Sequence, residues 1–339
     1  MSEYAASGVN IAAGNRAVAL MKAAVTATHG PEVLAGVGSF GGLFDAGGLK
    51  AMESPVLVAS TDGVGTKVAL AAQLGQLAGI GHDLVNHCVN DILVQGARPL
   101  FFMDYIAAGR LHPEAVAAIV RGMAEACSAV GCALLGGETA EMPGVYAEGA
   151  FDVAGTVVGV VERGNILPRA DVQPGDVLIG LASSGPHTNG YSLIRRLVAG
   201  QDLTTTRADL GGVSLGAALL TPHRNYLPVL RNLLWGDWRP IKALAHITGG
   251  GFVDNLPRCL PEACGFEIDT AAWPRPALFD WLVHFGKIGF HEAYFVFNMG
   301  IGMVAVVAAD EAARVLATLG AEAWVIGRVT DQPGGGELR

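Results

Sequence analysis

Residues 55–69 read Pro-Val-Leu-Val-Ala-Ser-Thr-Asp-Gly-Val-Gly-Thr-Lys-Val-Ala, and this stretch decides how the rest of the chain is interpreted. The apolar run 56–59 predicts a short buried strand, and two glycines predict a turn before a helix that begins near Lys67. Glycines let backbone N–H groups approach an anion, and a helix N-terminus favours negative charge. Asp62 offers a hard oxygen to Mg²⁺. The stretch therefore predicts a phosphate and metal site; the plainer alternative is a strand–turn–helix corner with a capping aspartate.

The length and composition of the chain limit the classes of protein to which it can belong. The chain has 339 residues, a net charge of −9, 51% apolar residues and 16% charged ones. This length favours two domains, and so few charges predict a large core and an oligomeric interface. The acidic balance argues against a nucleic-acid-binding face, although a few local donors could hold a small phosphorylated ligand. No apolar run reaches the about 18 residues of a membrane span and no secretory signal is recognisable, so we expect a cytoplasmic protein that does not enter a membrane.

The cysteines give a further hint about compartment. Five are present and none forms a Cys-x-x-Cys pair. This pattern predicts reduced, mostly buried thiols rather than a disulfide framework or a zinc site.

A helix predicted near 82–95 carries a polar stripe beside its apolar face. Asp83, His87 and Asp91 recur every four residues, and Asn90 lies next to them. Two carboxylates on one side of a helix can present oxygens to a metal. They can equally form a solvated face, and the sequence leaves both interpretations open.

Strand and helix patterns alternate along the whole chain. Further predicted elements are helices 13–28 and 113–130 and strands 99–106, 132–135, 151–161, 176–182 and 303–307. A cluster of Pro, Gly, Asn and Asp near 164–175 predicts the linker, so we divide the chain into domains 1–168 and 169–339. The alternation predicts an α/β or α+β two-domain enzyme whose loops gather at a groove between the domains.

The stretch Gly36–Gly41 matches the dinucleotide pattern G-x-G-x-x-G. No convincing strand precedes it and more glycines follow it, so we interpret it as a loop that folds over a ligand. Gly136-Gly137-Glu138-Thr139 repeats the earlier order of strand, glycine, acid and threonine.

Five longer motifs carry a resemblance to a known family. They are STDGVGTK at 60–67, CVNDILVQGARPLFFMDY at 88–105, LGGETAEMPGVY at 135–146, SSGPHTNGYSLIR at 183–195 and HITGGG at 246–251. In this order they closely resemble the phosphoribosylformylglycinamidine cyclo-ligases, also called aminoimidazole ribonucleotide synthetases. The likeness covers nearly the whole chain, from about Gly8 to Gly327.

The resemblance implies a fold and a reaction. Members have an N-terminal domain that contributes strands to an intersubunit β-barrel and a C-terminal α/β domain with a mixed sheet, and they act as homodimers. They convert formylglycinamidine ribonucleotide and ATP, with Mg²⁺, to 5-aminoimidazole ribonucleotide, ADP and phosphate in purine biosynthesis. ATP phosphorylates the formyl oxygen, and the amidine nitrogen of the same molecule then displaces phosphate.

The resemblance also implies site residues. The implied metal ligands are Asp62, Asp91 and Glu138. The implied ATP and phosphate contacts are Asp62, Gly63, Gly65, Thr66, Lys67 and Glu138. The implied substrate contacts are His187, Thr188, Asn189, Gly190, Thr248, Gly249, Gly250 and Gly251. The catalytic candidates are Asp91, His187 and Lys67.

Structural alternatives remain for these residues. Each acid or amine could instead stabilise a tight turn. His187 could act as a general acid or base, orient a phosphate, or be a hydrogen-bonded structural histidine. The segment Thr248–Gly251 could bind the substrate phosphate through backbone N–H groups or simply make a close turn.

The chain departs from the family pattern at several positions. Phe295 and Val296 stand where some members have Arg-Thr, so a contact made there by arginine would be absent or replaced. Asn10 stands where many members have Asp, and Asp45 cannot be assigned a register. His87 belongs to no family motif, and we treat it as incidental despite its spacing.

Competing functions within the same superfamily are thiamine-monophosphate kinase and selenophosphate synthetase. A selenophosphate synthetase would be expected to carry a reactive cysteine in its first glycine loop, whereas the first cysteine here is Cys88. The thiamine kinase lacks the 183–195 motif. A regulatory nucleotide-binding module without turnover is the alternative of a different class.

Overall fold

The computed structural model describes residues 11–36 and 38–339, which form two compact units. The first unit takes in the described residues up to Ile92 together with Ala97–Arg163. The second takes in Leu93–Gly96 and Gly164–Arg339. Asn10 lies outside the described residues.

The first unit is built on a four-stranded sheet within the described residues, in the order β3-β6-β4-β5. The β4–β5 pair is parallel and the other two pairs are antiparallel. Its longer elements are α2 (Ile11–Thr26), β3 (Pro55–Gly63), α3 (Lys67–Leu74), α4 (Ala78–Leu93), β4 (Arg98–Ala108), α5 (Pro113–Val130), β5 (Ala133–Glu141) and β6 (Phe151–Glu162). Shorter elements are β1 (Val33–Ala35), β2 (Leu43–Phe44) and the 3₁₀ helices η1 (Ala46–Ala51) and η2 (Arg163–Asn165).

The strands β3 and β5 continue well beyond their predicted ends. The strand β3 continues to Gly63 because every residue from Pro55 onward pairs with β6. The strand β5 runs through its glycine pair to Glu141 because β4 pairs with it over that whole length. Pairing with a neighbouring strand therefore overrides the glycine signals, and it places Asp62 and Glu138 inside strands rather than at loop tips.

The helix α5 shows why the helical predictions succeed. Its apolar positions recur three and four residues apart and are buried, at Val116, Ile119, Val120, Met123 and Cys127. Pro113 stands in the first turn, and Gly131 ends the helix in the left-handed conformation with φ +66°.

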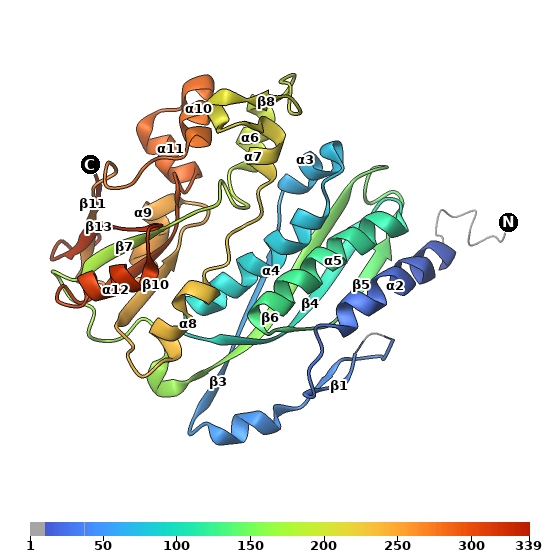
Figure 1. Cartoon of the computed structure of the whole chain (residues 1–339), viewed down its shortest axis with the longest axis horizontal. Coiled ribbons are helices and arrows are strands. Elements are labelled where there is room, and N and C mark those ends of the chain that lie inside the picture. The colour runs from blue at the N-terminus through green and yellow to red at the C-terminus, as the bar shows by residue number, and fades with distance from the viewer. Residues whose placement is uncertain (1–10, 37) are drawn as a thin grey trace. The chain divides into compact units, whose positions relative to one another are not determined.

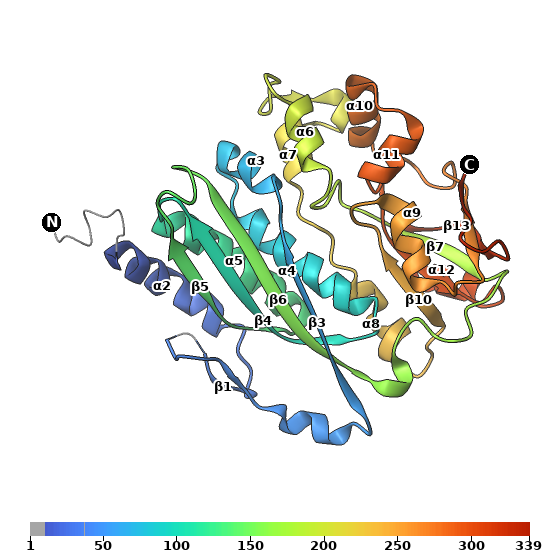
Figure 2. The same ribbon diagram turned by 180° about the vertical axis from the view of Figure 1, so that it is seen from behind.

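Helices α2, α4 and α5 lie on one side of this sheet, and among the described residues no α-helix of the same unit lies on the other side (Figures 1 and 2). Large apolar side chains remain exposed on the strands: Leu57 is 63% exposed, Met103 40% and Tyr105 39%. Single exposed apolar side chains are common on soluble proteins, but several on one sheet mark a candidate interface with another protein.

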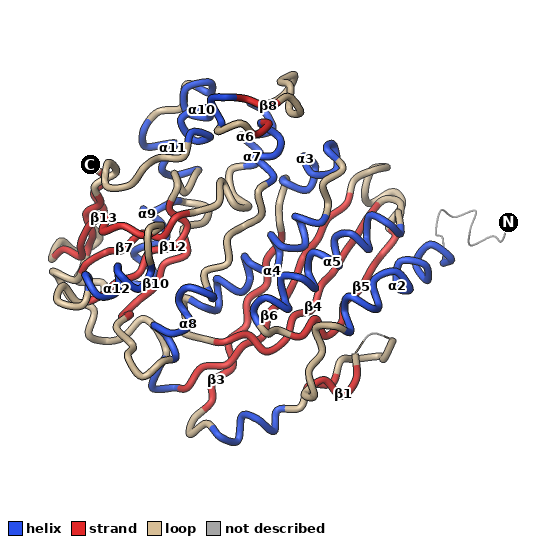
Figure 3. Tube along the Cα trace, viewed as in Figure 1, coloured by secondary structure: helices blue, strands red, loops and turns tan. Residues whose placement is uncertain are grey.

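The second unit holds a six-stranded sheet in the order β10-β12-β7-β13-β11-β14, with one parallel pair, β11–β14 (Figure 3). Its strands are β7 (Val177–Ala182), β10 (Ile241–His246), β11 (Gly265–Ile268), β12 (Ile301–Val307), β13 (Ala323–Thr330), β14 (Gly336–Leu338) and the small pair β8 (Thr206–Arg207) and β9 (Val213–Ser214). Its helices are α6 (Tyr191–Leu197), η3 (Ala208–Leu210), α7 (Leu215–Leu220), α8 (Leu227–Trp235), α9 (Gly251–Asn255), η4 (Leu256–Cys259), α10 (Ala277–Gly286), α11 (Phe290–Val296) and α12 (Ala312–Leu319). The mixed sheet with helices confirms the predicted α/β class.

Two further predictions from the sequence concern the state of the cysteines and membrane-spanning segments. All five cysteines are buried and free, as predicted. Over the described residues, none of the helices has the length and apolar character needed to span a membrane.

Candidate functional site

An acidic cluster forms in the first unit where β3 ends beside the helix α4. We define it by Asp62, His87 and Asp91. The Nε2 of His87 lies 2.9 Å from Asp62 Oδ2 and 3.7 Å from Asp91 Oδ2. Ser60, two residues before Asp62, donates its hydroxyl to Asp91 Oδ2 at 3.1 Å. The two carboxylates predicted from different motifs are therefore brought together around one imidazole.

The local geometry follows from the two elements. His87 and Asp91 are four residues apart on α4, so they lie on the same side of the helix. The backbone N–H of Gly63 donates to Asp62 Oδ1 at 2.7 Å and fixes that carboxylate at the end of β3.

Electrostatic interactions within the cluster favour the charged forms of Asp62 and His87. Burial raises the pKa of Asp62, but the hydrogen bond and charge of His87 and the Gly63 N–H outweigh burial, so this pKa lies below its ordinary value. Burial lowers the pKa of His87, but Asp62 and the charges of Asp91 and Asp83 outweigh it, so this pKa is raised. The two carboxylates thus favour the protonated form of His87, and His87 in turn favours the ionised form of Asp62.

The acidic cluster has donors that suit a hard divalent cation. The side chains of Asp62 and Asp91 are 43% and 28% exposed, so their oxygens can be reached from solvent. Carboxylate oxygens are the ligands that Mg²⁺ prefers. His87 Nε2 lies against the same carboxylate oxygens that a bound metal would contact. From the sequence, we treat His87 as incidental because no family motif contains it. Its four-residue spacing from Asp91 is the signal that could identify it.

Lys67 has a different environment from the one predicted. Its side chain is fully buried, and its Nζ lies 2.9 Å and 2.8 Å from the two carboxylate oxygens of Asp83, which is also fully buried. Burial lowers the pKa of Lys67, and Asp83 offsets part of that effect. A direct contact between Lys67 and a phosphate would require this ion pair to open.

Glu138 lies apart from the other two predicted metal ligands. Asp62 pairs with Gly155, which pairs with Asp104, which pairs with Gly137, the residue before Glu138. Three strand spacings separate these edge strands by roughly 14 Å. The predicted set of three carboxylates is therefore divided within one chain, because this separation is too large for Asp62 and Glu138 to hold a single ion.

Glu138 instead lines a cavity of about 580 Å³ in the first unit. The glycine-rich loop forms one wall with Gly38, Ser39, Phe40, Gly41 and Gly42, and the glycine pair of β5 with Glu138 and Thr139 forms another. Helix α2 closes the cavity with apolar side chains. A glycine loop facing an acid across a cavity fits the predicted loop that folds over a ligand.

The two predicted substrate segments lie close together in the second unit. A side chain added at Gly249 would come within 3.4 Å of Asn189 Oδ1. Asn255 donates its amide to the carbonyls of Gly249 and Gly251 at 3.2 Å and 2.7 Å and holds the second segment in place. His187 is fully buried and accepts a hydrogen bond from the Ser184 N–H at 3.2 Å.

Packing explains two of the glycines in these segments. A Cβ at Gly190, where φ is +77°, would approach the ring of Phe297 and would lie 3.1 Å from Val296 Cγ1. A Cβ at Gly251, where φ is +60°, would overlap the carbonyl oxygen of Tyr294. Val296, one of the departures from the family pattern, thus borders the first substrate segment.

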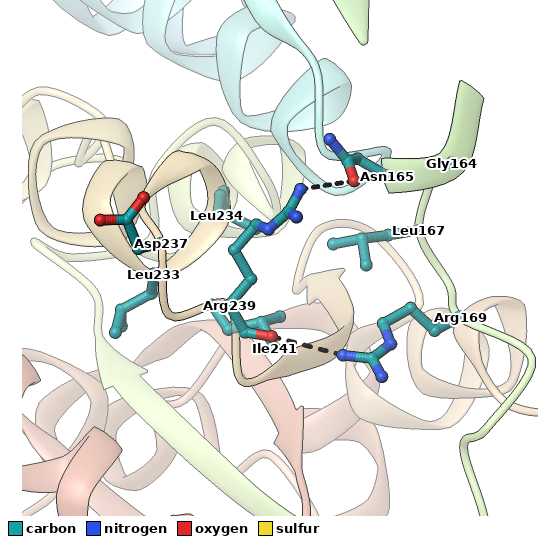
Figure 4. Close-up of a pocket in the computed structure, with 9 residues that line it drawn as sticks. All are labelled: Gly164, Asn165, Leu167, Arg169, Leu233, Leu234, Asp237, Arg239 and Ile241. Carbon is teal, nitrogen blue, oxygen red and sulfur yellow. Dashed lines mark hydrogen bonds between the residues drawn. The ribbon is translucent and has the colours of Figure 1, made fainter. Parts of the chain in front are cut away.

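A further cavity of about 390 Å³ lies in the second unit between the linker, α8 and β10 (Figure 4). Arg239 donates to the side chain of Asn165, and Arg169 donates to the carbonyl of Arg239. None of the residues that line this cavity is a predicted site residue.

The chain matches two family models. Residues 44–161 match the AIR synthase related protein, N-terminal domain, and residues 173–338 match the AIR synthase related protein, C-terminal domain.

Close relatives share one name. A protein named phosphoribosylformylglycinamidine cyclo-ligase from Exiguobacterium sibiricum is 48% identical over 98% of this chain and 97% of its own length. One of the same name from a Geobacillus species, strain WCH70, is 50% identical over 98% and 96%.

Solved structures show a shared fold. The hydrogenase maturation protein HypE from E. coli has a TM-score of 0.66 and 23% identity, and the match covers 94% of this chain and 93% of HypE. Thiamine-monophosphate kinase from Stenotrophomonas maltophilia K279a has a TM-score of 0.66 and 19% identity, over 94% and 95%.

Proposed function

This chain belongs to the phosphoribosylformylglycinamidine cyclo-ligase family, and from that membership we propose how its residues divide the reaction. The reaction is the ATP-dependent cyclisation of formylglycinamidine ribonucleotide to 5-aminoimidazole ribonucleotide, with release of ADP and phosphate, in purine biosynthesis. The single observation that carries the assignment is the near-full-length identity of 48–50% to relatives of that name.

The chemistry requires an oxygen to become a leaving group. We propose that the formyl oxygen attacks the γ-phosphorus of ATP, and the bond to ADP breaks. The amidine nitrogen then attacks the activated formyl carbon, the phosphate leaves with the oxygen, and the ring closes with loss of a proton. Both reacting groups belong to one molecule, so the protein gains most by holding that molecule in the reactive conformation.

We propose that the acidic cluster holds the Mg²⁺ that accompanies ATP, through Asp62 and Asp91. When bound, Mg²⁺ supplies positive charge to the phosphate oxygens. The proximity of these two carboxylates, their partial exposure and the lowered pKa of Asp62 support the proposal. Gly63, Gly65 and Thr66 follow Asp62 directly and are proposed phosphate contacts.

Glu138 and Lys67 are proposed to act outside that cluster. The cavity between the glycine-rich loop and β5 supports a separate contact of Glu138 with the nucleotide. We propose that Lys67 is a positioning residue, because its buried pair with Asp83 ties the start of α3 to α4.

The second domain is proposed to hold the substrate ribonucleotide. The adjacent segments His187–Gly190 and Thr248–Gly251 offer side-chain and backbone donors from one place in the fold. His187 is the proposed acid or base, or the group that orients a phosphate. Domains 1–168 and 169–339 would thus contribute nucleotide and substrate contacts respectively.

We propose that the chain works as a homodimer in the cytoplasm, with the first-unit sheets of two copies forming the β-barrel. The exposed apolar side chains Leu57, Met103 and Tyr105 support an interface on the strands of that sheet. A second copy is the occupant that the family resemblance implies.

The test uses purified protein with formylglycinamidine ribonucleotide and Mg-ATP. Aminoimidazole product is followed by diazo coupling and ADP by a coupled assay, and we expect the two to appear in equal amounts. Asp91→Asn is the active-site variant, and Glu125→Gln, which removes an exposed carboxylate on α5, is the matched control. ADP without product would refute the assignment, and thiamine monophosphate would then be tried as the phosphate acceptor.

A further inference from the structure

Three histidines from distant parts of the sequence meet inside the second unit. His187 follows β7, His223 lies between α7 and α8, and His246 is the last residue of β10. The strand β12 pairs with both β10 and β7, so the ends of these strands are held next to each other. We call His187, His223 and His246 the three-histidine cluster.

The rings of the cluster face one another at short range. The Nε2 atoms of His223 and His246 are 2.9 Å apart. The rings of His187 and His223 are stacked, with centroids 3.9 Å apart and planes inclined by 19°. One ligand nitrogen from each residue lies within 4.8 Å of those of the other two. All three residues are buried, with exposures of 0%, 1% and 6% in sequence order.

The backbone around the cluster is fixed by contacts between the loops. The hydroxyl of Ser184 donates to the carbonyl of Pro222 at 2.6 Å, directly before His223. Arg224 and the hydroxyl of Tyr226 both donate to the carbonyl of Ala182 at the end of β7, at 3.0 Å and 2.9 Å. The cluster is therefore held on a rigid frame rather than on free loops.

Two backbone features make room for the His187 ring. His187 has φ +58°, in the left-handed region that residues other than glycine seldom adopt, although histidine, asparagine and aspartate do so more often than the rest. Gly302 on β12 lies against this ring, and a Cβ there would overlap the His187 ring and the Tyr226 hydroxyl. An uncommon backbone conformation in an ordered, buried place supports a functional hypothesis.

Three buried imidazoles are a donor set for borderline-soft divalent metals rather than for Mg²⁺. We propose that the three-histidine cluster binds one Zn²⁺ ion. Two nitrogens on a tetrahedral zinc lie roughly 3.3 Å apart, given Zn–N bonds of about 2.0–2.1 Å. The His223–His246 distance needs a change of a few tenths of an ångström, and the widest separation needs to close by at most about 1.5 Å. If His187 binds through Nε2, the metal bond replaces the weak contact from the Ser184 N–H.

The charge around the cluster is compatible with a bound cation. Arg224, one of the residues that fix this frame, forms an ion pair with Glu322 at 2.9 Å, which offsets its positive charge. The three imidazoles bind metal as neutral ligands.

Zinc at this cluster would affect the proposed reaction through His187. This consequence rests on the proposed function, since it needs His187 to act on substrate. A metal-bound imidazole cannot accept or donate a proton, so turnover is expected to fall as zinc occupancy rises. Binding itself is independent of that role and is measured without substrate.

The experiment begins with full-length protein stripped by a chelator. Zn²⁺ is titrated by calorimetry, and metal content is measured after desalting. We expect one zinc per chain in the wild type and at least about a tenfold loss of affinity in His223→Gln. His284→Gln, which removes an exposed histidine of the same unit, is the matched control and should bind as the wild type does. Zinc below a tenth of an equivalent in the wild type, or unchanged binding in His223→Gln, would overturn the proposal.

X-ray absorption at the zinc edge on the wild type keeps the proposal testable if His223→Gln does not fold. Three imidazoles around zinc support it. One imidazole with carboxylates, together with loss of zinc in Asp91→Asn, would assign the ion to the acidic cluster and overturn it.

Discussion

Replacing Lys67 by Met separates a structural role for this lysine from direct phosphate binding. The substitution keeps most of the side-chain volume but removes the ammonium. The carboxylate of Asp83 then stays inside the fold with its cation lost, and both side chains are 0% exposed. Breaking a buried ion pair from one side typically costs about 3–5 kcal/mol.

A loss of this size is easily measured. For a domain of about this length it lowers the melting temperature by roughly 6–20 °C. Calorimetry and urea unfolding would measure it, and turnover would be assayed well below the new midpoint. Adding Asp83→Asn to Lys67→Met removes the stranded charge, so the double variant should recover about half of the lost stability or more.

The exposed pair of Arg16 and Glu114, with an N–O distance of 2.6 Å, provides the control. Arg16→Met should leave the melting temperature unchanged within error, because solvent screens an exposed pair. A stable Lys67→Met protein that has lost ATP-dependent turnover would contradict the structural role. That result would support the alternative assignment, in which Lys67 contacts a phosphate directly.

Three more outcomes are expected. Asp91→Asn should keep the fold, as judged by melting temperature, while turnover falls by about two orders of magnitude or more, since a ligand oxygen loses its charge. Burial raises the pKa of Asp104 to about 7, so the native state binds more protons than the unfolded state between about pH 4 and 7. The free energy of unfolding of the wild type should fall as pH rises through that window. Urea unfolding should show that Asp104→Asn becomes more stable relative to the wild type between pH 5 and 8, by at most about 4 kcal/mol. Gly302→Ala should lower stability by about 1–3 kcal/mol, because the new methyl group overlaps His187 and Tyr226; an unchanged urea midpoint would show that those rings can move.

Sequence patterns and the family resemblance together singled out two acids that the fold brings close to each other. Asp62 and Asp91 come from separate motifs, yet both end at the acidic cluster, because a strand end and a helix side are predictable from local periodicity. The family resemblance, rather than spacing, supplied the reaction.

Other features depend on contacts that local patterns do not encode. The lengths of β3 and β5 are set by pairing with neighbours, and this pairing puts Glu138 on the far edge of the sheet from Asp62. The partner of Lys67 is sixteen residues away along the chain. For His87 the local signal is present, because its four-residue spacing from Asp91 is visible in the sequence. The prediction leaves His87 out of the site because no family motif contains it.

One side of the first-unit sheet carries no α-helix among the described residues, and this affects how the stability of the protein should be measured. If a second copy covers that side, folding and assembly share one equilibrium, and mass action links them. Stability then is a function of concentration: a dilute sample would melt at a lower temperature than a concentrated one. Comparisons between variants hold only when the number of molecules per litre is kept the same.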